Sequence, residues 1–299
     1  METIACDLCG SVNFKKCWTV HDRLTNSGEN FTVVECIRCG LVFVNPRPTQ
    51  EEILRYYPEE YAPYHRTRGM MGRFKRFLLR GEVRRLKKIV PGDAKILDVG
   101  SGGGEDAAFL RDCGGWKVEG VDVSEYAARQ GKAEFGLTIH AGTLEALRFP
   151  DASYDVVRMK YVMSHVHSPR KLLKEVYRIL KPGGRIFTWI PNFDSLNRMI
   201  FNGYWEGGEA PRHLYDFGTA TISRYLMEAG FSIEKIRHSV LPNTSVHSFR
   251  QVLLARGASS IVSNFFTLNI VSMVFFFPLS FLALLVRRSD RLAIRARKL

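Results

Sequence analysis

The sequence lacks a secretory signal, because its first residues carry no basic stretch followed by an apolar run. We therefore expect a cytosolic chain, in which thiols are kept reduced and cysteines can bind metal instead of forming disulfides. Acidic residues are also scarce: 30 Asp and Glu stand against 43 Lys and Arg, a formal net charge of +13. This balance favours an anionic partner, either a membrane surface or a nucleic acid.

The positive charge is concentrated in two segments. Arg66 to Lys88 contains ten Lys and Arg residues against one Glu, and Arg287 to Leu299 contains six against one Asp. Within Met70 to Val90, apolar residues recur at roughly helical spacing between the basic ones. Two interpretations stay open: a helix packed across the core with its charges in water, or a basic amphipathic helix lying on anionic lipid.

Four of the six cysteines form two Cys-x-x-Cys pairs, each followed by glycine. Two thiolates at this spacing can grip one ion, and four complete a closed tetrahedral site that is structural and not catalytic. We therefore predict a small zinc ribbon over residues 1–47, in which a structural Zn2+ substitutes for a hydrophobic core. The predicted ligands are Cys6, Cys9, Cys36 and Cys39.

A glycine-rich turn follows an apolar run in the middle of the chain. Lys95 to Val99 predicts a buried parallel strand, a Gly-Ser-Gly-Gly-Gly turn starts at Gly100, and a helix begins at Glu105. Glycine permits positive φ and lets a ligand approach the backbone closely. A second strand, Lys117 to Asp122, ends in a carboxylate about 20 residues later, where a ribose diol can be held. This spacing fits both NAD and S-adenosylmethionine.

The longer pattern distinguishes between these two cofactors. Four strings occur in order between Asp93 and Arg256: ILDVGSGGG, GVDVS, FPDASYDVV and HVHSPRKLLKEVYRILKPGGR. Together they resemble the class I S-adenosylmethionine-dependent methyltransferases. The string CGLVFVNPRPTQEEILRYY is similar to the amino-terminal part of bacterial methyltransferases with a zinc-ribbon head, which are often associated with surface-polysaccharide or small-molecule pathways. The resemblance implies an α/β fold with a Rossmann-like seven-stranded sheet.

The resemblance also implies which residues bind S-adenosylmethionine. The glycines lie against its methionine half with Asp98 on the amino group, while Asp122 holds the ribose hydroxyls and Val123 packs on adenine. The full implied set is Asp98, Gly100, Ser101, Gly102, Gly103, Asp122, Val123, Thr143, Leu144 and Lys160. The sequence departs from the family pattern at Thr143, where a small or acidic residue is commoner, and at Ser164, which replaces a frequent acidic residue.

A sulfonium methyl group is already activated, so the protein mainly aligns a nucleophile. A hydroxyl nucleophile also needs a general base, a role that suits histidine near neutral pH, although a lone histidine is more often structural. Four candidates lie on loops at the expected ligand edge of the sheet: His165, His167, His213 and Tyr215. The aromatic, glycine-rich segment from Gly203 to Phe217 is expected to form a substrate lid.

Residues 48–92 are expected to form a linker and the basic helix, and residues 93–256 the methyltransferase domain. Alternating strands and helices predict a parallel sheet covered on both faces, with the ligand at the carboxyl ends of its strands. A final antiparallel pair is expected at Ile233 to Val240 and His247 to Ala255.

The last segment, residues 257–299, contains a run of 26 residues without a charge, Ile261 to Val286. This run is long enough to span a bilayer, but a single span would export the basic tail against the positive-inside preference, and Pro278 interrupts the run. We therefore predict a membrane-associating hairpin in peripheral or monotopic contact with the inner leaflet. A single transmembrane span and an appendage that docks on a partner or a second copy are the alternatives.

These expectations together predict methyl transfer to a small-molecule, glycan or lipid-linked acceptor at the cytosolic membrane face. An RNA methyltransferase is the alternative that the ribbon and the basic charge suggest. Against it, the fourth strand ends Arg158-Met159-Lys160-Tyr161, without the Asn/Asp-Pro-Pro-aromatic pattern that grips a flipped base, so nucleic acid is not the expected partner. A non-catalytic binding module of the same fold is the remaining alternative.

Overall fold

The computed structural model describes residues 1–24, 28–239, 241–267 and 269–299. Its larger part is built on a seven-stranded sheet with the order β10-β11-β8-β7-β4-β5-β6. The strands are β4 (Lys95–Val99), β5 (Lys117–Asp122), β6 (Ile139–Ala141), β7 (Tyr154–Lys160), β8 (Leu180–Pro191), β10 (Phe231–His238) and β11 (Arg291–Lys298). The first five run parallel, whereas β11 lies antiparallel between β8 and β10. The predicted seven-stranded α/β sheet is confirmed.

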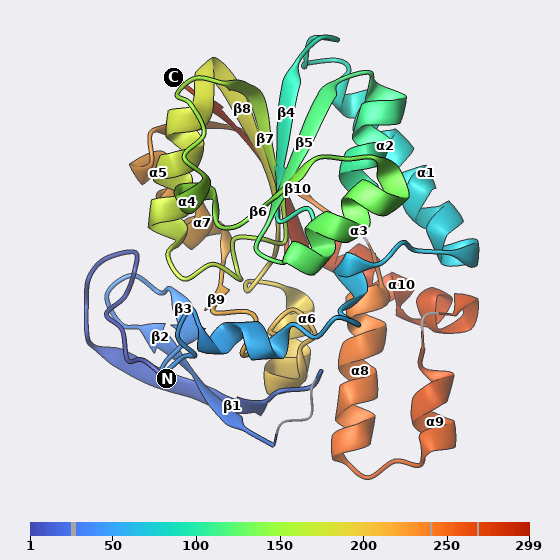
Figure 1. Cartoon of the computed structure of the whole chain (residues 1–299). Helices are drawn as coiled ribbons and strands as arrows, with labels where there is room; N and C mark the ends of the chain where they lie inside the picture. The colour runs from blue at the N-terminus through green and yellow to red at the C-terminus, as the bar shows by residue number, and fades with distance from the viewer. Residues whose placement is uncertain (25–27, 240, 268) are drawn as a thin grey trace.

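Helices cover both faces of this sheet, with α1, α2 and α3 on one face and α4, α5 and α7 on the other (Figure 1). Their bounds are α1 (Gly69–Leu86), α2 (Glu105–Gly114), α3 (Glu125–Phe135), α4 (Leu144–Leu147), α5 (Pro169–Ile179) and α7 (Thr219–Glu228). Because both faces are covered, the central strands are apolar on both sides, and every residue of β4 after Lys95 is buried.

The basic helix α1 packs on the core along only part of its length. Its second half packs on the core and buries Leu79, Glu82, Val83 and Leu86. Its first half leaves large apolar side chains exposed between arginines: Met70, Met71, Phe74, Phe77 and Leu78. One end of the helix is therefore part of the core, and the other end presents a mixed apolar and basic surface.

The amino-terminal segment forms a separate small sheet with the order β1-β2-β3-β9. The strands are β1 (Phe14–His21), β2 (Asn30–Cys36), β3 (Val42–Val44) and β9 (Tyr215–Asp216). Strand β9 comes from a part of the chain that follows β8, and its pairing with β3 joins the predicted ribbon to loops of the larger sheet. Two short 3-10 helices, η1 (Glu52–Tyr56) and η2 (Ala62–Tyr64), lie in the linker from the small sheet to α1.

The prediction for the carboxy-terminal residues is wrong in two places. The segment predicted as a basic tail forms β11, and the predicted strand His247 to Ala255 is part of helix α8 (Asn243–Ala255). In β11 the side chains of Leu292, Ile294 and Ala296 are buried, and the arginines alternate with them. Burial therefore repeats every two residues, as in a strand, although the segment is highly charged. The larger sheet therefore extends beyond residue 256, and Val240, at the end of the preceding predicted strand, lies outside the described residues.

An apolar insertion, residues 243–290, lies between β10 and β11. It contains α8, α9 (Ser260–Phe265) and α10 (Ile270–Leu285), and α8 packs on α6 (Leu196–Phe201) and η3 (Asn202–Tyr204). The insertion leaves and rejoins the sheet at one edge, where His238 pairs with Leu292. A single span that exports the residues after Val286 is incompatible with the position of β11. In the part of the chain that the structure describes, no helix has the length and apolar character needed to cross a membrane, and Leu268 of the predicted run lies outside that part.

Candidate functional site

Asp122 ties the end of β5 to the glycine-rich turn after β4. Its two carboxylate oxygens accept hydrogen bonds from the backbone amides of Gly102, at 2.8 Å, and Ser124, at 3.0 Å. Burial raises the pKa of this carboxyl group. Each oxygen keeps a second lone pair, so ribose hydroxyls can still donate to it, and the 52% exposed Val123 leaves an apolar surface beside it. This donor and acceptor set fits the nucleoside half of S-adenosylmethionine.

The backbone of the linker also lies against the glycine turn, a contact that the sequence did not predict. The amide of Gly103 donates to the carbonyl oxygen of Pro63, 3.0 Å away, in the linker. A Cβ at Gly102 or Gly103 would overlap the carbonyl oxygens of Pro63 or Tyr64, so only glycine allows the linker to lie this close. The linker therefore covers the turn that is expected to face the cofactor.

Tyrosine side chains of the linker form a row along this cover. The ring centroids of Tyr57 and Tyr61 are 5.3 Å apart, and those of Tyr61 and Tyr64 are also 5.3 Å apart. Burial and then the charge of Asp122 raise the pKa of Tyr64 to about 12, so that end of the row lies close to the carboxylate. At the other end, the hydroxyl of Tyr57 lies 2.7 Å from Nδ1 of His165. The row therefore connects the predicted ribose site to one of the predicted catalytic residues.

Asp98 is held by a buried arginine that the prediction missed. Arg158, in the middle of β7, donates to Asp98 at 2.8 Å, to Glu82 of α1 at 2.7 Å and to Asp106 of α2 at 3.0 Å. Asp106 also accepts from Lys160 at 2.7 Å, which places that predicted residue at the end of β7. Burial opposes ionisation of Asp106, but Lys160 and Arg158 hold its pKa well below the usual value. The available sequence signal was an arginine within the otherwise apolar run from Val156 to Met159.

The structure separates the four catalytic candidates into two groups. The rings of His165 and His213 lie 4.6 Å apart and nearly perpendicular to one another. Nδ1 of His213 lies 2.7 Å from the carbonyl oxygen of Gly207, and because a carbonyl can only accept, Nδ1 carries the proton and Nε2 remains basic. Burial lowers the pKa of both histidines, so both imidazoles are neutral near neutral pH.

His167 and Tyr215 instead hold the small sheet in place. The Tyr215 hydroxyl donates to the carbonyl oxygen of His167 at 3.0 Å and accepts from Arg47 at 2.8 Å. Nε2 of His167 lies 3.1 Å from the carbonyl oxygen of Pro48. These hydrogen bonds join the start of the linker to the loop after β7, which is a structural role.

Three residues of the implied cofactor set also have structural contacts. The Thr143 hydroxyl accepts from the amide of Ala146 at 3.3 Å and so caps α4, and the neighbouring Leu144 is buried. The Ser101 hydroxyl donates to the carbonyl oxygen of Val121 at 3.4 Å.

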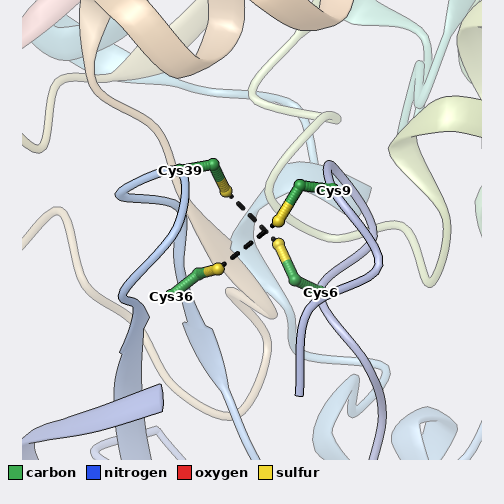
Figure 2. Close-up of side chains that lie close together, drawn as sticks. All are labelled: Cys6, Cys9, Cys36 and Cys39. Carbon is green, nitrogen blue, oxygen red and sulfur yellow. Dashed lines mark hydrogen bonds between the residues drawn. The ribbon is translucent and has the colours of Figure 1, made fainter. Parts of the chain in front are cut away.

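The four predicted metal ligands lie together, with their sulfur atoms pointing toward one another (Figure 2). All four sulfur atoms lie within 4.8 Å of one another, and Cys6–Cys39 and Cys9–Cys36 are each 3.5 Å apart. Tetrahedral zinc with Zn–S bonds of about 2.3 Å needs sulfur atoms about 3.8 Å apart, so the set fits this ion. The glycine after each pair has a positive φ, 72° and 73°, as the predicted tight turns require.

Asp7, inside the first cysteine pair, connects this cluster to the larger sheet. Its carboxylate accepts from the hydroxyls of Ser168 at the start of α5 and Tyr225 of α7, each at 2.9 Å. Arg170 donates to the carbonyl oxygen of Leu8 at 2.6 Å. No sequence pattern pointed to this contact, because the partners are more than 150 positions apart.

Residues 65–236 match a protein-family model described as "Methyltransferase domain". The chain is 37% identical over 129 residues to a demethylmenaquinone methyltransferase of Symbiobacterium thermophilum, covering 39% of this chain and 50% of that protein. It is 36% identical over 112 residues to a ubiquinone biosynthesis O-methyltransferase of Idiomarina loihiensis, covering 36% of this chain and 44% of that protein. The chain thus spans about half the length of the curated relatives it matches.

Two solved structures show the same fold. The crystal structure of a cyclase named SpnF has a TM-score of 0.57 at 16% identity, covering 84% of this chain and 97% of that chain. An S-adenosylmethionine-dependent methyltransferase from Archaeoglobus fulgidus has a TM-score of 0.51 at 22% identity, covering 75% of this chain and 94% of that chain. Because one of these proteins is named as a cyclase, the fold by itself does not determine the reaction.

Proposed function

The chain belongs to the methyltransferase-domain family, and from this premise we propose that it transfers a methyl group from S-adenosylmethionine to an amphiphilic acceptor at the cytosolic face of a membrane. The acceptor is a small molecule, a glycan or a lipid-linked compound. The observation that supports this most is the position of the apolar insertion, which leaves the sheet at the edge where Asp122 and the glycine turn lie. Parallel strands bind ligands at this carboxyl edge, so an acceptor partly dissolved in lipid can reach the cofactor from the insertion.

The residues that would hold the cofactor surround Asp122. Its carboxylate binds the ribose hydroxyls, Val123 supports the adenine ring, and the glycine turn accommodates the methionine half. When bound, S-adenosylmethionine supplies a methyl group on a positively charged sulfur. The linker tyrosines close over this region and exclude water, which favours transfer to the acceptor over hydrolysis.

His213 is the proposed base for a hydroxyl acceptor. In the part of the chain that the structure describes, its Nε2 has no hydrogen-bond partner and can take the acceptor proton while Nδ1 donates to the carbonyl oxygen of Gly207. His165 packs against its ring, and Tyr57 holds His165 through Nδ1. Both imidazoles are neutral because they are buried, so no proton has to leave before catalysis near neutral pH.

The face of α10 that points away from α8 is exposed and apolar. Its buried residues, Ser272, Phe276, Ser280 and Ala283, share the face toward α8, where the ring centroids of Phe249 and Phe276 are 5.5 Å apart. The exposed large apolar side chains of α9, α10 and the residue after α10 are Val262, Phe265, Ile270, Val271, Val274, Phe275, Phe277, Phe281, Leu282, Leu285 and Val286. Such a surface suits a helix lying in the membrane interface. The names of the two quinone-pathway relatives also support an apolar acceptor.

A structural Zn2+ at the four cysteines is the second part of the proposal. Cys6, Cys9, Cys36 and Cys39 would complete its coordination, leaving no open position for a reacting ligand. The ion would thereby hold the loop that contains Asp7 against α5 and α7.

Calorimetric titration of the full chain with S-adenosylmethionine tests the cofactor site. Asp122→Asn should weaken binding by roughly 1–3 kcal/mol, because the amide removes charge and acceptor capacity facing the ribose. The matched control is Asp112→Asn on the surface of α2, which should bind as the unaltered chain does. No binding by the unaltered chain would refute the proposed cofactor.

Incubation with methyl-labelled S-adenosylmethionine tests the acceptor class. Lipid extract and total RNA from a bacterial cell are supplied in separate reactions, and we expect label in the organic phase of the lipid reaction. Label found in RNA alone would contradict the amphiphilic acceptor.

A further inference from the structure

Arg291 is a half-buried arginine at the edge of the sheet where the acceptor is proposed to bind. It is the first residue of β11 and pairs with Pro191, the last residue of β8, so it lies at the carboxyl ends of the parallel strands. Among the residues that the structure describes, its guanidinium has no ion pair and donates no hydrogen bond. Its described contact is the ring of Tyr161, whose centroid lies 5.5 Å away.

Tyr161 is held in this place by an unusual backbone conformation. It directly follows β7 and has a φ of 61°, which is uncommon for a large side chain. Its amide donates to the carbonyl oxygen of Trp189 at 2.8 Å, which keeps the residue against β8. Strained backbone of this kind collects at ligand sites, where the surrounding structure keeps a side chain in position. The ring therefore serves as a fixed support for the guanidinium.

Further positive charge lies near Arg291. After burial, the charges of Arg250 and Arg291 lower the pKa of His247, so both arginines are close to this residue of α8. Arg287 and Arg288 precede β11 at the end of the apolar insertion. An anion at Arg291 would therefore also lie near the positive charge of Arg250 on the side of the insertion.

Two acidic groups, Asp290 and Glu206, also lie near Arg291 without pairing with it. Asp290 is buried and accepts hydrogen bonds from Asn197 and Trp205, so its oxygens are directed into the core. Burial raises the pKa of Glu206 to about 7, and the charges of nearby arginines, including Arg291, act against this rise. Neither carboxylate satisfies the donors of the guanidinium, which stay available to a ligand.

We propose that Arg291, supported on the ring of Tyr161, is an anion-binding site for the phosphate group of an amphiphilic ligand. The paired N–H donors of a guanidinium match the oxygens of a phosphate. The site lies where β11 leaves the apolar insertion, so a ligand with its phosphate here can place its apolar part along α10. The inference rests on the proposed function for the nature of the acceptor, but phosphate binding can be measured without any methyl transfer.

The test compares two glutamine variants of the full chain. Arg291→Gln removes the charge and keeps a polar side chain of similar length, and β11 pairs with its neighbours through backbone atoms that this change leaves in place. Arg297→Gln is the matched control, because it makes the same change on the same strand at the opposite edge of the sheet, where the side chain is exposed. Calorimetric titration with inorganic pyrophosphate is the first arm, and sedimentation with vesicles of phosphatidylcholine containing phosphatidic acid is the second.

We expect Arg291→Gln to weaken binding about tenfold or more in at least one arm, and Arg297→Gln to change it by less than about twofold. If Arg291→Gln weakens only the binding of pyrophosphate, the site binds the phosphate group of a soluble ligand. If it weakens only the binding of vesicles, the site binds a lipid headgroup. Equal weakening by both variants, or no binding by the unaltered chain in either arm, would overturn the site. Titration of Arg291→Gln with S-adenosylmethionine, expected to be unchanged, separates this outcome from failure of the proposed function.

Discussion

Replacing Arg158 by methionine tests whether one guanidinium neutralises three acidic groups in the core. Arg158→Met keeps a long side chain in β7 but leaves Glu82 and Asp98, both buried, without their cation. Asp106 keeps Lys160 and Lys75, at 2.7 and 3.0 Å, so the loss falls mainly on the other two. Removing one partner of a buried ion pair costs about 3–5 kcal/mol, because the remaining charge is stranded away from water. We expect the free energy of unfolding to fall by about this amount.

The loss of unfolding free energy in Arg158→Met should be larger at high pH than at low pH. Burial already raises the pKa of Asp98 in the native protein, and removal of Arg158 would raise it further. An acid whose pKa is higher in the folded state binds more protons when folded. The stability that such an acid contributes to the folded state is therefore fully present below its unfolded pKa of about 3.9. This stability is lost as the pH rises through the folded pKa. Arg158→Met should thus lie closer to the unaltered protein at about pH 5 than at about pH 8.

Urea unfolding followed by tryptophan fluorescence at both pH values measures these differences. Arg178→Met is the matched control, because Arg178 forms ion pairs with Glu175 and Asp151 at the surface of α5, where such pairs contribute at most about 1 kcal/mol. A loss in Arg158→Met no greater than that of the control, or an equal loss at both pH values, would refute the reasoning.

Three further perturbations have expected outcomes. We expect elemental analysis to find zinc in the purified unaltered chain and in Cys17→Ser, which lies outside the cluster, but not in Cys39→Ser; equal zinc in the two variants would contradict the site. Phe275→Ser, on the exposed face of α10, should reduce sedimentation with anionic vesicles, whereas Met227→Ser, an exposed position on α7, should not; no difference between them would argue against membrane contact by α10. Asp7→Asn should lower the free energy of unfolding by about 1–3 kcal/mol in urea titration, because it weakens two hydrogen bonds that join the cysteine cluster to α5 and α7. An unchanged urea midpoint would show that this contact does not stabilise the protein.

Local sequence was sufficient for the features in which neighbouring residues act together. The strand, glycine turn and helix around Gly100, the carboxylate at the end of β5 and the cysteine pairs all lie where the spacing predicted them. Each depends on a periodicity or a turn that a few consecutive residues specify. The strand β11 was missed because its four Lys and Arg residues, together with the two arginines just before it, outweighed the alternation of Leu292, Ile294 and Ala296.

By itself, the sequence determined the α/β sheet and the groups that can bind a nucleoside and a metal, because burial, backbone conformation and ligand chemistry are properties of short segments. Only the tertiary structure decided which partners those groups have. It paired Asp98 with Arg158 and separated His165 and His213 from His167 and Tyr215. Within the described ranges, it also placed the guanidinium of Arg291 where no carboxylate pairs with it. These contacts join residues far apart in the chain, and their formation depends on how whole elements pack around a common core.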